Sequence, residues 1–401
     1  MSSPSAVDRP PSRANAVAPH FTSIAAAETA RYATDPDPAA DYVYARFGTA
    51  ASRALERRYD ELLGASWSSV VTSGTTAIDV ALSACLLSAP DRDAVVLVTE
   101  GLYVGTRRYF ERILAGLRGV RVVIAPYPEQ GGDISEFAEA VRRERPVAVF
   151  TESVTNPFLA VGDVPGMSRV CGETGAVLVV DATVTPPPNV SPLELGADLV
   201  VHSATKYLNG RNDVLAGVVS GRTGTYRQAC ADYRRLVGAV LDDRSCADLL
   251  EDSGSVAERF LRQSANSRTA AALLNEAPQV ARVWAPAAAP ADAEGHPDGA
   301  LVTFELVVPE GESARSQCDA FVEAAAPEIP FSTSFGSTGS TLTLVGLLDR
   351  DHAHRPILRL SCGTESWEQL RPVLRRALAA LPGDGTGPGH LLTGTRGDES
   401  A

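Results

Sequence analysis

The chain almost lacks lysine. Of its 401 residues 36 are basic, and only Lys206 among these is a lysine. Such a bias replaces lysine by arginine wherever a positive charge alone is needed, so the exception is informative. Arginine does not deprotonate in proteins, whereas an amine becomes a nucleophile once it loses its proton. The bias therefore predicts a chemical function for Lys206.

Other absences exclude several classes of protein. No run of eighteen apolar residues occurs, and the first nineteen residues lack the charged and apolar regions of a signal peptide, so we expect no membrane and a cytosolic location. The net charge is -13 and no stretch collects the basic residues, so no nucleic-acid partner is expected. The six cysteines form no C-x-x-C pair, which favours reduced thiols and predicts no metal site.

The composition, 44% hydrophobic and 21% charged, is that of a globular chain with a sizeable core. Residues 1–40 are polar and proline-rich and predict a flexible N-terminal arm, and residues 383–401 predict a disordered tail. Between them we expect a large domain over 41–275 and a small C-terminal domain over 276–382.

Short apolar runs alternate with amphipathic segments of helical length. This alternation predicts a doubly wound α/β fold with a mainly parallel sheet. The runs that predict its strands are Ala94–Val98, Val120–Ala125, Pro146–Thr151, Ala176–Asp181 and Asp198–His202. A long helix is expected from about Cys246 to Asn275. The small α+β domain should then contain strands at Ala300–Val308 and Ile357–Ser361 and helices near Ser313–Ala325 and Trp367–Leu381.

Ligands of open parallel sheets gather at the carboxyl ends of the strands. Ser73, Gly74 and Thr75 lie where a strand passes into a helix, so free N–H groups there could bind a phosphate, although an ordinary helix cap has the same pattern. Another strand ends in Asp181, a carboxylate that is costly to bury without a positive partner. A protonated pyridine nitrogen would be such a partner, and a helix cap or an arginine pair would also serve.

A third strand end carries Lys206. The hydroxyls of Ser203 and Thr205 precede the lysine and could bind phosphate oxygens beside it. His202 is a weaker candidate for a catalytic base, because its side chain should alternate to the strand face opposite Ser203, and we interpret it as a structural histidine.

Four segments occur in a specific order: Glu152-Ser-Val-Thr-Asn-Pro157, Asp181-Ala-Thr183, His202 to Gly210, and Asp213-Val-Leu-Ala-Gly217. In this order and spacing the chain, from about Tyr44 to Leu370, closely resembles the cystathionine γ-synthase/γ-lyase family. These are enzymes of Cys/Met metabolism that use pyridoxal 5'-phosphate (PLP) and have PLP fold type I.

The resemblance implies roles for individual residues. Lys206 would hold PLP as a Schiff base, and Asp181 would pair with the pyridinium nitrogen. Ser203, Thr205 and the Ser73-Gly74-Thr75 turn would surround the phosphate. The ring itself would be contacted by Asn156 at its hydroxyl and by Tyr103 and Thr183 on its two faces.

Further matches concern the substrate and the assembly. Arg359, in Leu358-Arg-Leu-Ser-Cys-Gly-Thr-Glu365, would clamp the substrate α-carboxylate with Ser340 beside it. Tyr44 and Arg46 match a pair that reaches the phosphate of a neighbouring subunit. The resemblance thus implies a homodimer that shares its active sites, usually paired into a homotetramer.

The chain departs from the family where substrate choice is made. Val104-Gly105 replaces paired glycines after Tyr103, and Ala182 replaces an asparagine. Glu251 to Val256 falls where the family has a basic stretch, and the loop around Gly346 to His354 is shortened. A reshaped pocket is therefore expected.

The sequence accordingly predicts γ-elimination or γ-replacement on an unbranched L-amino acid, whose leaving group need not be sulfur. Lys206, released from PLP, would move protons as a general base, with Tyr103 and Asp181 as further catalytic residues. The alternatives are a PLP-dependent β-lyase, an aminotransferase of the same fold, and an inactive binding or structural subunit. Lys206, Asp181, Tyr103 and Arg359 together argue against the inactive subunit.

Overall fold

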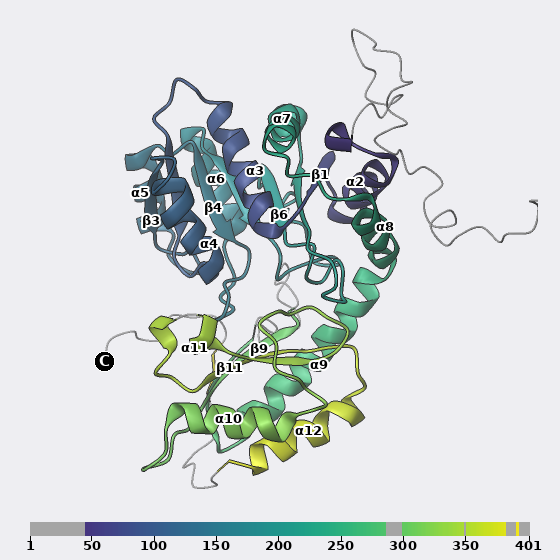
Figure 1. Cartoon of the computed structure of the whole chain (residues 1–401). Helices are drawn as coiled ribbons and strands as arrows, with labels where there is room; N and C mark the ends of the chain where they lie inside the picture. Colours follow the sequence, from purple (N-terminus) through teal and green to yellow (C-terminus); the bar gives the residue numbers. More distant parts are fainter. Residues whose placement is uncertain (1–44, 286–298, 349, 382–389, 393–401) are drawn as a thin grey trace, which may run out of the picture.

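The computed structural model of the chain describes residues 45–285, 299–348, 350–381 and 390–392. Two parts follow each other along the chain (Figure 1). The first is built on a seven-stranded sheet and the second on a five-stranded sheet. Helix α9 (Val256–Asn275) runs from the first part to the second (Figure 1).

The large sheet has the strand order β1-β7-β6-β5-β4-β2-β3. Only β7 runs opposite to the other six strands, so the sheet is mainly parallel, which confirms the predicted fold class. The predicted strands match five of the observed ones to within two residues. The seven strands are β1 (Trp67–Val71), β2 (Val95–Thr99), β3 (Arg121–Ala125), β4 (Ala148–Glu152), β5 (Val177–Asp181), β6 (Leu199–His202) and β7 (Gly217–Gly221).

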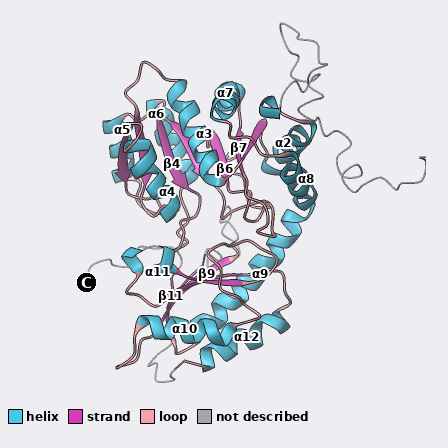
Figure 2. Ribbon diagram, viewed as in Figure 1, coloured by secondary structure: helices cyan, strands magenta, loops and turns pink. Residues whose placement is uncertain are grey.

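Helices cover both faces of this sheet (Figure 2), which explains why its inner strands are mostly apolar and are buried at almost every position. In β4, Ala148 and Phe150 pack against α3, α4 and η3, whereas Val149 packs against α5 and α6. Successive side chains of one strand thus enter two separate cores. The helices are α2 (Ala50–Leu63), α3 (Gly74–Leu87), α4 (Val104–Tyr109), η3 (Phe110–Ala115), α5 (Ser135–Glu144), α6 (Val164–Thr174), α7 (Arg227–Val237) and α8 (Asp243–Asp252).

The second sheet has the order β10-β11-β9-β8-β12 and is antiparallel except where β12 pairs with β8. Its apolar face packs against α10, α12 and the end of α9, as predicted for a smaller α+β unit. Figure 2 shows α10 and α12 below its strands. The elements are β8 (Val280–Trp284), β9 (Leu301–Leu306), α10 (Ala314–Ala325), β10 (Thr341–Leu344), α11 (Val345–Leu348), β11 (Ile357–Ser361), α12 (Trp367–Ala379) and β12 (His390–Leu392).

Two expectations differ from the structure. The long helix predicted from Cys246 to Asn275 is interrupted by a 3-10 turn, η5 (Ser253–Ser255), because Gly254 has a low helix propensity. Arg58 donates to the backbone oxygen of Ser253 at 3.2 Å and satisfies a carbonyl that the interruption exposes. The short strand β12 lies within the segment predicted to be a disordered tail; the predicted N-terminal arm lies outside the described residues.

Within the described parts of the chain, no helix is long and apolar enough to cross a membrane, and no group of side chains has the composition of a metal site. All six cysteines are buried and free.

Candidate functional site

A cavity of about 190 Å³ opens at the carboxyl ends of the parallel strands, where the sheet topology predicts a ligand site. Both sheets contribute to its walls. Glu152 and Asp181, which pair in register at the ends of β4 and β5, stand beside Lys206, which follows β6. The lining residues are Ser73, Gly74, Thr75, Ile78, Tyr103, Thr106, Glu152, Val154, Asn156, Asp181, Thr183, Val184, Ser203, Lys206, Leu215, Thr333, Phe335 and Arg359.

Lys206 projects from the turn after β6 into this cavity. Its Nζ donates a hydrogen bond to Ser334 Oγ at 2.6 Å, and the centroid of the Phe335 ring lies 5.0 Å from the same nitrogen. Burial and the nearby Arg359 guanidinium lower the pKa of Lys206 to about 8. A substantial fraction of the amine is therefore neutral near pH 8, as nucleophilic and basic chemistry requires.

Asp181 lies in the wall next to Glu152. Thr183 donates to Asp181 Oδ1 from its backbone nitrogen at 2.9 Å and from its hydroxyl at 2.5 Å. Burial raises the pKa of Asp181 to about 6, while the Thr183 hydrogen bonds oppose that shift. Burial and the charge of Asp181 hold the pKa of Glu152 well above its ordinary range. Asp181 is thus the carboxylate that ionises first, and it fits a positive ring nitrogen.

The turn into α3 has the features of an anion site. Ser73 caps the helix by accepting a hydrogen bond from Thr76 N at 3.1 Å, and the N–H groups of Gly74 and Thr75 have no acceptor within the helix. A Cβ atom at position 74 would lie 2.7 Å from the Cβ of Ser203, so this approach requires glycine. The free N–H groups at the start of α3 and the Ser203 side chain line the same cavity, and together they have the chemistry of a phosphate site.

Thr205 has a different position from its predicted one. Its hydroxyl donates to Ala216 O at 3.3 Å and accepts from Ala216 N at 3.0 Å, and it is absent from the cavity lining. These bonds tie the lysine turn to the segment before β7. Thr183, by contrast, accepts a hydrogen bond from Ser203 N at 2.8 Å. This bond links the end of β5 to the turn that follows β6.

Arg359 brings the second sheet to the site. Its side chain is 1% exposed, and burial lowers its pKa to about 10. One Nη donates to Asn156 Oδ1 at 2.9 Å and the other to Thr343 Oγ1 at 3.3 Å, whereas Nε has no partner. A buried guanidinium with an unused donor fits a carboxylate ligand.

Tyr103 lies at the start of α4 and is 40% exposed. Its backbone nitrogen donates to Glu152 Oε1 at 2.7 Å. A Cβ atom at Gly105 would lie 2.6 Å from Cε1 of the tyrosine ring, so the small residue there makes room for the ring. The ring is therefore held at the open side of the cavity.

Besides Thr205, two predicted residues, Ser340 and Arg46, do not line this cavity. Ser340 is buried and donates to Glu365 Oε2 at 3.0 Å. Arg46, in the 3-10 helix η2 (Ala45–Phe47), donates to Arg235 O at 3.2 Å at the end of α7. Tyr44 lies outside the described residues. His202 is buried, and burial lowers its pKa to about 4, as expected for a neutral structural histidine.

The sequence missed four lining residues of consequence: Glu152, Leu215, Thr333 and Phe335. Glu152 gave the same signal as Asp181, a carboxylate at the end of an apolar strand, and could have been found by it. The other three come from loops whose approach to Lys206 depends on tertiary structure alone.

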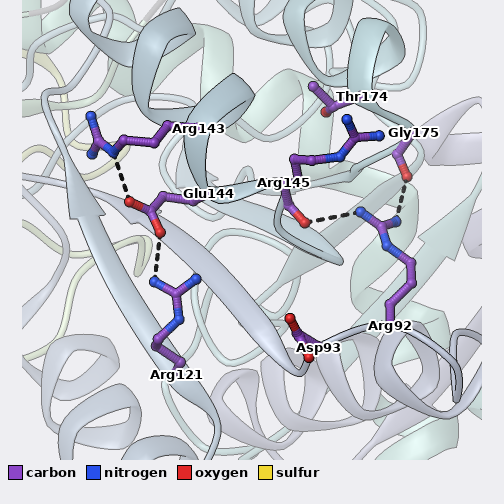
Figure 3. A pocket seen from close by; sticks show the side chains of 8 residues that line it. All are labelled: Arg92, Asp93, Arg121, Arg143, Glu144, Arg145, Thr174 and Gly175. Carbon is purple, nitrogen blue, oxygen red and sulfur yellow. Dashed lines mark hydrogen bonds and ion pairs between the residues drawn. The ribbon is translucent and has the colours of Figure 1, made fainter.

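A second pocket, of about 710 Å³, lies at the opposite edge of the large sheet and is rich in arginine (Figure 3). Its arginines have structural roles. Arg92 donates to the carbonyls of Arg145, Pro146 and Gly175 and so caps the carboxyl ends of α5 and α6. Glu144 accepts from both Arg121 and Arg143. Glu152, Asp181 and Lys206 lie at the opposite ends of the strands, in the first cavity.

Residues 8–379 match the Cys/Met metabolism PLP-dependent enzymes, and the chain belongs to this family. Its fold is that of a PLP enzyme, and PLP is its cofactor. The resemblance inferred from the motifs is thereby confirmed.

Individual relatives have different names. The chain is 30% identical over 361 residues to a probable cystathionine γ-synthase 2 of Arabidopsis thaliana, covering 85% of this chain and 82% of the relative. It is 29% identical to the cystathionine β-lyase MetC of Bacillus subtilis, covering 85% of this chain and 87% of the relative.

Among solved structures, a cystathionine γ-synthase of Xanthomonas oryzae in complex with cystathionine superposes with a TM-score of 0.76 at 27% identity, over 85% of this chain and 88% of that one. The apo methionine γ-lyase CalE6 of Micromonospora echinospora has a TM-score of 0.73 at 30% identity, over 84% of this chain and 89% of that one.

Proposed function

We propose that the chain catalyses γ-elimination or γ-replacement on an unbranched L-amino acid that carries a leaving group at Cγ. The observation that carries this proposal is the convergence of Lys206, Asp181 and the incompletely paired Arg359 on one cavity. Relatives named as γ-synthase and methionine γ-lyase support γ chemistry. We further propose a cytosolic location.

In this proposal Lys206 would hold the cofactor covalently, and Asp181 would pair with its ring nitrogen. Ser73, Gly74, Thr75 and Ser203 would hold the phosphate, with Thr205 positioning the turn. Asn156 would contact the ring hydroxyl, and Tyr103 and Thr183 would contact the ring faces. PLP, when bound, withdraws electrons from Cα of an attached amino acid.

The residues of the chain hold the substrate and move its protons. Arg359 binds the α-carboxylate through its unused Nε donor, which keeps Cα next to Lys206. Lys206 acts as a base once the substrate amine has taken its place on the cofactor. The free amine, with its pKa near 8, removes the proton at Cα, passes that proton on, and as a neutral amine again removes a proton at Cβ. Tyr103, at the open side of the cavity, assists proton transfer near the leaving group. Ionised Asp181 stabilises the positive ring nitrogen throughout.

A β-lyase is the second candidate, because relatives named cystathionine β-lyase are 27–29% identical to this chain. β-Elimination needs the same contacts to the cofactor and the same carboxylate clamp. It differs in one atom-level requirement, since no proton need leave Cβ before the leaving group departs.

We also propose that the active protein is a homodimer with shared sites, paired into a homotetramer. Arg46, and Tyr44 before it, would complete the phosphate site of the neighbouring subunit. Two observations support this arrangement. Tyr44 and Arg46 match the positions of the family's pair, and Arg46 does not line the cavity of its own subunit.

Isotope exchange in heavy water tests γ against β chemistry. An unbranched L-amino acid without a leaving group, such as L-norvaline, should exchange its hydrogen for deuterium at Cα first and then at Cβ. Proton NMR monitors the loss of each signal. Both exchanges should vanish in Lys206→Ala. Exchange confined to Cα, in an analogue shown by its effect on the cofactor spectrum to bind productively, would contradict the γ assignment and favour the β-lyase.

A further inference from the structure

The amine of Lys206 is the end of a chain of hydrogen bonds. Lys206 Nζ donates to Ser334 Oγ at 2.6 Å, and Ser334 Oγ donates to Asn212 Oδ1 at 2.9 Å. Lys206 and Asn212 belong to the segment between β6 and β7, whereas Ser334 belongs to the loop before β10. The chain of hydrogen bonds therefore joins the two parts of the molecule at the site.

Asn212 is held in an unusual backbone conformation. Its φ is +58°, in the left-handed region that favours glycine and, among other residues, asparagine. Both neighbours are anchored: Arg211 N donates to Asn209 Oδ1 at 3.1 Å, and Asp213 accepts from Asn209 Nδ2 at 2.9 Å. Arg211 also pairs with Asp252 at 3.1 Å. These contacts fix the turn from which the Asn212 side chain reaches Ser334.

The Ser334 loop is anchored to the same turn. Thr338 N donates to Gly210 O at 2.9 Å, and Gln263 Nε2 donates to Ser337 O at 2.7 Å. At Gly336, with φ +86°, a Cβ atom would lie 2.8 Å from Tyr207 N, so the loop approaches the lysine turn too closely for a side chain. The distance between Ser334 and Asn212 is thus set by packing on both sides.

The direction of these hydrogen bonds matters for the amine. A serine hydroxyl has one hydrogen, and when Asn212 accepts it, a lone pair of the oxygen faces Lys206. An oxygen in this orientation stabilises the protonated amine relative to the neutral one. Were the hydroxyl free to turn, it would donate to the neutral amine and reverse the effect.

We propose that Asn212 is a positioning residue for Lys206, which acts by directing the Ser334 hydroxyl so that its oxygen holds the amine in one place. This inference rests on the catalytic role proposed above for Lys206. Asn212 itself does not line the cavity. The charged groups that share the cavity with the amine are Arg359, Asp181 and Glu152, and the hydrogen bonds described above for them do not involve Asn212.

The single lysine makes the test direct. Cofactor-free protein labelled with [ε-13C]lysine has one Cε resonance, and its pH titration gives the pKa of Lys206. Asn212→Gly keeps the left-handed backbone but removes the acceptor, so we expect the pKa to fall by about half a unit. Asn212→Asp keeps an acceptor and adds a negative charge, so the pKa should rise by a similar amount.

A double-mutant cycle shows whether Asn212 acts through Ser334. Ser334→Ala should lower the Lys206 pKa by itself, and adding Asn212→Gly should then change nothing further. Arg145→Gly is the matched control, because Arg145 has φ +45° at the opposite edge of the sheet, and its replacement should leave the Lys206 pKa unchanged. Circular dichroism and urea unfolding verify that each variant folds.

In the PLP-loaded enzyme, Asn212→Gly should lower kcat with KM nearly unchanged, because Arg359 still holds the substrate carboxylate. Additive effects of Asn212→Gly and Ser334→Ala on the pKa, no shift in Asn212→Gly, or shifts of opposite sign would overturn the inference. Failure of the proposed function is distinguishable, since wild-type protein would then show isotope exchange confined to Cα or none at all, whatever the pKa of Lys206.

Discussion

Asp181 stands in a wall that already contains a second buried carboxyl, Glu152. Without a positive partner, ionisation of Asp181 is unfavourable, which is why burial raises its pKa to about 6. The unfolded chain ionises an aspartate near pH 4. Ionisation therefore destabilises the cofactor-free fold as the pH rises through this interval, and the penalty is complete above pH 6.

We accordingly predict that Asp181→Asn stabilises the cofactor-free protein at pH 8. The gain in the free energy of unfolding should be at most about 3 kcal/mol, since one pKa unit corresponds to about 1.4 kcal/mol, and it should disappear below pH 4. Urea unfolding at the two pH values measures it. The same variant, loaded with PLP, should lose most turnover, because a neutral amide does not keep the ring nitrogen protonated.

Asp133 provides a control of opposite sign. It is exposed, and hydrogen bonds from Ser135 lower the pKa of its carboxyl, so Asp133→Asn should bring no gain at pH 8. Equal stability of wild type and Asp181→Asn at both pH values would show that Asp181 is not held in an unfavourable charge state.

Among individual side chains, the sequence predicted the cavity residues that follow parallel strands. Lys206, Asp181 and Ser203 could be placed because the carboxyl ends of parallel strands meet at one edge. Thr205 alternates away from that edge toward β7, and Ser340 turns toward Glu365. Neither outcome could be predicted, since each depends on which neighbour supplies the nearer hydrogen-bond partner.

Helices α2 and α7 are joined by a buried ion pair. Arg234 donates to Glu56 Oε1 at 2.8 Å and to Val70 O at 3.0 Å, and both side chains are at most 7% exposed. We predict that Glu56→Leu lowers the free energy of unfolding by about 3 to 5 kcal/mol, because the Arg234 charge then remains buried without a carboxylate. Urea unfolding of the cofactor-free protein measures the loss.

Replacing both partners should restore part of this stability. The double variant Glu56→Leu, Arg234→Met removes the unpaired charge and should unfold at a higher urea concentration than Glu56→Leu alone. Disruption of the exposed pair Arg315 and Asp319 on α10 should change stability little. A double variant as unstable as Glu56→Leu would show that the loss of stability comes from lost packing and not from the unpaired charge of Arg234.

The strands predicted correctly are those with a continuous apolar run. The strands β2, β4, β5 and β6 are covered on both faces, and β3, a partly exposed edge strand, still has the run Val122-Val-Ile-Ala125, so composition identifies all five. In contrast β7, Gly217-Val-Val-Ser-Gly221, has only two large apolar residues and is bounded by glycines, and it runs antiparallel to β6 after the turn through Asn212. Such a reversal is set by a loop conformation and leaves no periodic signal in the strand.

We predict that each active site of the assembled homodimer is formed by residues of two subunits. Arg46→Ala and Lys206→Ala subunits, each inactive alone, should regain activity when mixed after joint unfolding and refolding. Half of the sites in a heterodimer would then have Arg46 and Lys206 both intact, provided that Arg46 serves the neighbouring subunit. Turnover of the mixture, compared with each parent, measures the recovery.

Two-tag purification confirms that heterodimers have formed. Confirmed heterodimers without activity would count against shared sites. As a control, mixing Asp181→Asn with Lys206→Ala should restore nothing, because both residues lie in the cavity of the same subunit.

The order of synthesis also bears on Lys206. Ser334, which holds the amine in the folded protein, follows the lysine by 128 residues. At translation rates of ~5 to 20 residues per second, the ribosome needs roughly 6 to 26 seconds to make that interval. During this time the nascent chain carries its only lysine without the serine that restrains it or the arginine that lowers its basicity. The reactivity of the amine is therefore acquired late, when the last third of the chain has been made and folded.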